Sequence, residues 1–127
     1  MSRSGQDRLR WVRLAAAVAD DKKATDTLII DVGDVLAVTD HCVITSAANP
    51  RQVHAVVDAI EHELKLAGGP APLRVEGKQE REWVLMDYGA FVVHVFGSAQ
   101  RDFYQLERLW SDRPRLDWTP TQPLDPS

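Results

Sequence analysis

The chain has a single cysteine among 127 residues, no long apolar run and no excess of positive charge. The single cysteine, Cys42, excludes an intrachain disulfide and favours a reducing compartment. No run approaches the ~20 apolar residues of a membrane span. The basic N-terminal residues are not followed by the apolar stretch of a signal peptide. These absences predict a cytoplasmic protein with no membrane partner.

Nucleic acid and nucleotides are also disfavoured as partners. The net charge of −4 argues against general binding to phosphates, which needs clustered Lys and Arg. The sequence contains neither GxGxxG nor GxxxxGK[ST], so it lacks a phosphate cradle. Gly97–Ser98 is not followed by the Asp-x-Asp pair of metal-dependent nucleotidyl transfer. We expect no cofactor and no direct, sequence-specific contact with nucleic acid.

Two groups of residues could still carry metal chemistry. His54, Asp58 and His62 have i, i+4, i+8 spacing, which suits a metal site, although a solvated polar helix face is the commoner reading. Asp31 and Asp34 could hold Mg²⁺ or act as acid and base, although loop capping beside a glycine is commoner. We therefore predict no catalytic residue and no metal site.

The pattern of apolar residues predicts one α/β domain over residues 1–112, with a mixed β-sheet covered by helices. The expected order is helix, strand, strand, helix, three strands and a final helix. Asn49, Pro50 and Gln52 are typical of a helix start, and Gly68–Gly69 of its end. The four prolines of residues 113–127 favour an extended, flexible C-terminal tail.

The first helix should bury an apolar stripe of Trp11, Leu14, Ala15 and Val18. A third strand is expected at Pro72–Val75, at an edge of the sheet because proline donates no hydrogen bond.

The most aromatic part of the chain is a predicted hairpin formed by Trp83–Asp87 and Phe91–Phe96. Gly89 can take positive φ in the short turn between the strands. Alternation groups Phe91 with Val93 and Val95 as a core face, and leaves Val92, His94 and Phe96 on the other face. Either Trp83, Leu85 and Asp87 or Val84, Met86 and Tyr88 could share that second face, because the sequence does not settle the register.

Aromatic and charged residues in this region suit a protein-binding surface. The expected partner-binding residues come from the hairpin and the helix after it: Trp83, Asp87, Tyr88, His94, Phe96, Arg101, Tyr104 and Glu107. Asp87 and Glu107 supply negative charge for a basic partner. The competing interpretation is that most of these aromatic residues belong to the core.

Six runs, in this order, resemble the ribosomal silencing factor family, which is also called Iojap-like. They are Thr39–Ile44, Asn49–Val53, Val75–Gly77, Glu82–Gly89, Val93–Phe96 and Arg101–Trp110. The resemblance covers Leu9 to Asp112. The sequence departs from the family pattern at His41 and Cys42, where an aromatic pair is common, and at Ala90, where Asp is common.

The resemblance implies a fold similar to nucleotidyltransferases without their catalytic motif. It also implies a translation repressor that binds the large ribosomal subunit through ribosomal protein fourteen and blocks joining of the small subunit when nutrients are limiting. Two alternatives remain open from the residues. One is a metal-dependent nucleotidyl or phosphoryl transferase that uses Asp31, Asp34 and His94. The other is an oligomeric interaction module, and a homodimer is left open for the free protein.

Overall fold

The structure, a computed structural model, describes residues 2–31, 40–79, 82–97 and 115–116. The elements are α1 (Ser2–Asp21), β1 (Thr25–Asp31), β2 (His41–Ala47), α2 (Pro50–Leu66), β3 (Arg74–Glu76), β4 (Trp83–Asp87), β5 (Phe91–Gly97) and β6 (Arg115–Leu116). The predicted order is confirmed from the first helix to β5. The predicted final helix lies outside the described residues.

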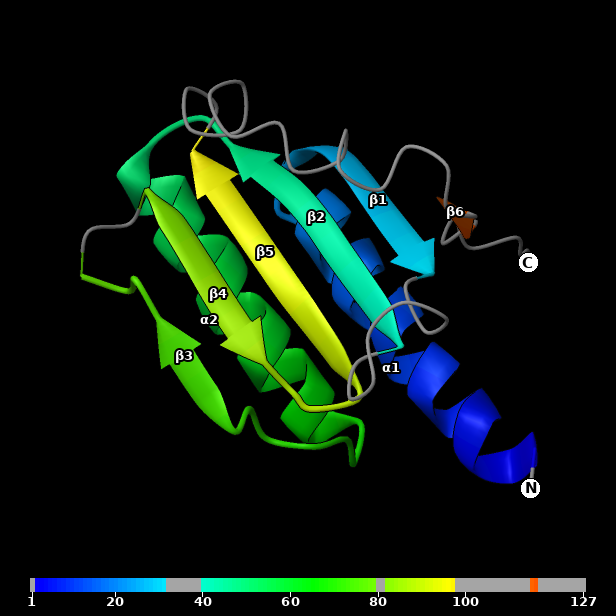
Figure 1. Cartoon of the computed structure of the whole chain (residues 1–127). Helices are drawn as coiled ribbons and strands as arrows, with labels where there is room; N and C mark the ends of the chain where they lie inside the picture. Colours follow the sequence, from blue (N-terminus) through cyan, green and yellow to red (C-terminus); the bar gives the residue numbers. More distant parts are fainter. Residues whose placement is uncertain (1, 32–39, 80–81, 98–114, 117–127) are drawn as a thin grey trace.

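The strands form one mixed sheet in the order β3-β4-β5-β2-β1, with the two-residue β6 beside β1. Neighbouring strands are antiparallel except β2 and β5, which are parallel. Both helices lie on the same face of the sheet (Figure 1). The predicted α/β domain with a mixed sheet is therefore confirmed.

The ends of α2 follow from local signals in the sequence. The Asn49 side chain accepts a hydrogen bond from the backbone N–H of Gln52 at 2.8 Å, and the Gln52 side chain accepts one from the N–H of Ala48 at 2.6 Å. These bonds satisfy N–H groups that have no partner within the helix. At the other end Gly68 adopts φ +85°, and Gly69 N–H donates to the Leu64 carbonyl at 2.8 Å. The predicted start and stop are both confirmed.

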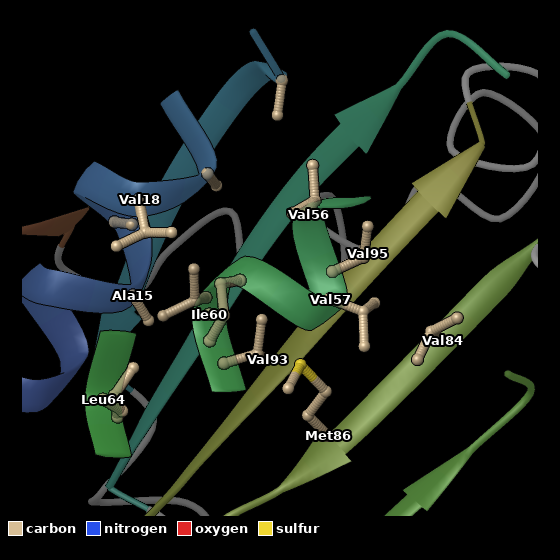
Figure 2. Packing of buried hydrophobic residues seen from close by; sticks show 14 of the residues in the cluster. Ala15, Val18, Val56, Val57, Ile60, Leu64, Val84, Met86, Val93 and Val95 are labelled. Atoms are coloured by element: carbon tan, nitrogen blue, oxygen red, sulfur yellow. The ribbon is translucent and has the colours of Figure 1, made fainter. Parts of the chain in front are cut away.

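The main core lies between the helices and the sheet. Figure 2 shows Val57, Ile60 and Leu64 of α2 over Val93 of β5 and Met86 of β4. All five side chains are fully buried. Each such side chain contributes roughly 1.5–3 kcal/mol on removal from water. This packing fixes the helices against one face of the sheet.

The prediction for α1 is confirmed at Ala15 and Val18, which are buried, but the rest of the buried stripe is rotated from the predicted one. Val12, Ala15, Ala16 and Ala19 are fully buried, whereas Trp11 and Leu14 are only partly buried. The reason is close packing, since small alanines allow the helix backbone to approach its neighbours. Trp11 instead packs beside Gly69, where a Cβ would lie 2.9 Å from its ring.

The opposite face of the sheet has a second, smaller cluster. Ile30, Cys42, Ile44 and Phe96 are buried there, and Leu28 and Trp83 pack against them. Burial raises the pKa of the Cys42 thiol to about 11, so the thiol stays protonated at neutral pH. We call this side of the sheet the second face.

Part of the predicted tail pairs with the sheet. Arg115 and Leu116, which belong to the predicted tail, pair with Ile30 and Ile29 of β1. Two residues of the tail therefore extend the sheet.

Within the described ranges, no helix is both long and apolar enough to cross a membrane.

Candidate partner-binding site

The register of the β4–β5 hairpin decides which side chains reach the second face. Trp83 lies opposite Phe96, Leu85 opposite His94, and Asp87 opposite Val92. Residues directly opposite in an antiparallel pair share a face, so Trp83, Leu85 and Asp87 stand on the second face. Val84 and Met86 pack in the core under α2. The structure thus selects one of the two arrangements that the sequence left open.

Trp83 is fixed by contacts on two sides. Its indole N–H donates a hydrogen bond to Nδ1 of His94 at 3.1 Å. Its ring also stacks on Phe96, with 5.0 Å between centroids and 24° between planes. The side chain is only partly buried. It is therefore an aromatic surface held in one orientation before any partner arrives.

His94 is a neutral, buried histidine. It is 8% exposed, and burial lowers its pKa to about 4. At neutral pH the imidazole is uncharged, and Nδ1 is the nitrogen that accepts from Trp83, so Nε2 carries the proton. Its direct role here is to orient Trp83.

Asp87 is engaged by its own chain. One carboxylate oxygen accepts the backbone N–H of Gly89 at 2.8 Å, and the other lies 3.7 Å from Nη2 of Arg74. The first contact fastens the turn in which Gly89 adopts φ +86°, as predicted. The side chain retains 27% exposure.

Tyr88 and Phe96 are core residues in this structure. Phe96 is fully buried in the second-face cluster, and Tyr88 is 6% exposed on the helix side, stacked on Phe91 at 4.7 Å. Burial, together with the nearby charge of Glu61, raises the pKa of Tyr88 well above its usual range. Its hydroxyl has no hydrogen-bond partner among the described residues. Of the expected hairpin residues, Trp83 and Asp87 keep the most accessible surface, and Arg101, Tyr104 and Glu107 lie outside the described residues.

A hollow of about 250 Å³ opens beside Trp83, over the end of β3 and the start of β4. Its lining includes Glu76, Gly77, Trp83 and Leu85. Glu76 lies directly opposite Leu85, which places its side chain on the second face as well. Glu76, Gly77 and Leu85 are not among the residues expected from the sequence. Strand alternation made Leu85 one of two alternatives for the second face, whereas the position of Glu76 depends on the β3–β4 register.

The candidate metal and catalytic residues that the structure describes do not come together in one site. Asp31 pairs with His41 in the sheet and follows Ile30, so it points away from the second face, where His94 lies. Asp34 lies outside the described residues. On α2, Nε2 of His54 contacts the Asp58 carboxylate at 2.8 Å, and His62 is exposed. No group of three or more potential metal ligands occurs among the residues described.

Fold and site together define an α/β domain in which the partly exposed Trp83, oriented by His94 and Phe96, stands on the sheet face opposite the helices. A family model described as "Ribosomal silencing factor during starvation" matches residues 6–126, which takes the likeness past Asp112 into the tail. The ribosomal silencing factor RsfS of Bacillus subtilis is 38% identical over 106 residues, covering 84% of this chain and 89% of that protein.

Solved structures agree with this likeness. A crystal structure from Chromobacterium violaceum has a TM-score of 0.77 at 32% identity, covering 81% of this chain and 85% of that one. A second, from Bacillus halodurans, has a TM-score of 0.72 at 31% identity, covering 88% and 98%. The chain therefore belongs to the ribosomal silencing factor family, a family of translation regulators rather than of enzymes.

Proposed function

We propose that this protein is a cytoplasmic translation repressor that binds the large ribosomal subunit through ribosomal protein fourteen. Its bulk on that subunit sterically blocks association with the small subunit, and translation falls under nutrient limitation or in stationary phase. The observation that carries the proposal is the family match over residues 6–126.

The charge of the chain supports a protein partner. With a net charge of −4 it is poorly suited to gripping ribosomal RNA, but complementary to a basic ribosomal protein. Blocking subunit joining needs occupancy and bulk only. We infer that the domain is a nucleotidyltransferase-like fold that performs no catalysis and needs no cofactor or metal.

The proposed contact surface is centred on the second face of the hairpin. Trp83 and Asp87 supply accessible area, and His94 and Phe96 hold Trp83 in position. Aromatic residues fixed in this way suit interface hot spots, because little side-chain entropy is lost on binding. Arg101, Tyr104 and Glu107 complete the surface in this proposal, whereas Tyr88 is left out because it is buried on the helix side. A homodimer of the free protein stays an open alternative.

Sedimentation through a sucrose gradient tests the proposal. Purified protein is mixed separately with isolated large and small subunits, and we expect it to travel only with the large subunit. Asp31→Asn and Asp34→Asn should travel with it equally well, since no metal chemistry is involved. Migration with the small subunit, or with neither, would refute the proposal. Loss of binding by the folded Asp variants would favour the metal-dependent transferase instead.

A further inference from the structure

The hollow over the end of β3 and the start of β4 has walls of contrasting chemistry. Trp83 and Leu85 of β4 give it apolar sides, and Glu76 of β3 places a carboxylate beside them. Gly77 lets the backbone after β3 lie against the start of β4. It adopts φ +85°, and a Cβ there would overlap the carbonyl of Trp83. The close approach of the backbone at Gly77 and Trp83, beside the hollow, therefore requires glycine at position 77.

The aromatic wall is rigid. Trp83 is tied through its indole N–H to His94 and is stacked on Phe96, which is fully buried. A ring held in this way offers its surface to a ligand at low entropic cost. Trp is also the aromatic side chain that attracts a cation most strongly over its face.

The charge of Glu76 is available to a ligand. Its carboxylate lies 3.1 Å from Nε of Arg74, but the two side chains are 56% and 64% exposed. Ion pairs this exposed contribute little and exchange readily. Arg74 also reaches toward Asp87, at 3.7 Å, so it keeps a carboxylate partner when Glu76 turns to a ligand.

We propose that this hollow receives one arginine or lysine side chain from the protein partner. The apolar stem of that side chain lies against Trp83 and Leu85, and its charged end meets Glu76. The inference rests on the proposed function for the identity of the partner as a basic ribosomal protein. It moves the principal acidic contact from Asp87, which fastens its own turn, to Glu76.

The affinity of full-length variants for isolated large subunits tests this assignment. Glu76→Gln keeps the size of the side chain and removes its charge, and we expect binding about tenfold weaker in low salt. The dependence of affinity on salt should also become shallower, which a purely structural role of Glu76 would not produce. Leu85→Ala should weaken binding without changing the salt dependence.

Glu82→Gln is the matched control. It removes the same charge from an exposed residue next to Trp83 that does not line the hollow. We expect its affinity to match the original protein. Unchanged binding by Glu76→Gln would overturn the proposal. A loss confined to Leu85→Ala would also overturn it, and would assign the hollow to an apolar side chain.

A measurement on the isolated protein keeps this inference separate from the proposed function. N-acetyl-arginine amide, titrated into ¹⁵N-labelled protein, should shift the indole N–H resonance of Trp83, and the shift should shrink in Glu76→Gln. N-acetyl-norleucine amide is the uncharged control. Equal shifts with the two amides, or no shift, would overturn the cationic site even if the protein binds large subunits. A shift specific to the arginine amide would support the cationic site even if the protein does not bind large subunits.

Discussion

At the scale of single residues, His94 and Trp83 act as a unit whose geometry depends on a neutral imidazole. Nδ1 of His94 can accept the indole N–H only while it is unprotonated. Burial favours that state by lowering the pKa to about 4. Protonation would therefore cost folding free energy and would disturb Trp83.

Stability should consequently fall as the medium becomes acidic. An unfolded histidine titrates near 6.5 and His94 in the folded protein near 4, so the unfolded state binds more protons between these pH values. The free energy of unfolding should drop by up to about 3 kcal/mol as pH falls from 6.5 to 4. Urea unfolding at a series of pH values measures this drop.

His94→Asn provides the comparison, since an amide oxygen can accept from Trp83 but does not titrate. Subtracting its pH profile from that of the original protein isolates His94 from the carboxylates. Identical slopes in the two proteins would show that His94 does not contribute.

Asp87 allows a second prediction at this scale. Asp87→Ala removes the acceptor for Gly89 N–H and should lower the free energy of unfolding by about 0.5–1.5 kcal/mol. Asp87→Asn keeps an oxygen at that place and should unfold at nearly the same denaturant concentration. Equal losses in both variants would mean that the charge, rather than the turn hydrogen bond, stabilises the hairpin.

At the scale of elements, the helix and hairpin signals are local and could be read from the sequence. Asn49, Pro50 and Gln52 fix the start of α2 through bonds within four residues of one another. Gly89 is a local signal of the hairpin turn, because its positive φ favours glycine. The two-residue strand β6 carries no such signal, because its place depends on pairing with the distant strand β1.

The cap of α2 should make a measurable contribution to stability. Asn49→Ala should lower the free energy of unfolding by about 1 kcal/mol, because the N–H of Gln52 loses its acceptor. Asn49→Ser, which can still cap, should lose far less, and Arg51→Ala on the exposed first turn serves as the control. Thermal and urea unfolding measure all three. A loss as large in Arg51→Ala as in Asn49→Ala would show that the cap hydrogen bond of Asn49 is not the cause.

At the scale of the whole molecule, α1 and α2 cover one face of the sheet, and the proposed contact surface lies on the other (Figure 1). The sequence predicted that Phe91, Val93 and Val95 are core, because alternation alone decides it. It could not predict which β4 residues face His94. That depends on the register, which also carries Tyr88 into the helix-side core. The hollow beside Trp83 was unpredictable for the same reason, since Glu76 comes from another strand.

The proposed function requires that the bound protein prevents the two ribosomal subunits from joining. Light scattering of purified subunits, brought to conditions that favour joining, measures it directly. Large subunits saturated with this protein beforehand should show little or no rise in scattering when small subunits are added, and the rise should return as the protein is diluted away. A full rise with the protein bound to every large subunit would contradict the account.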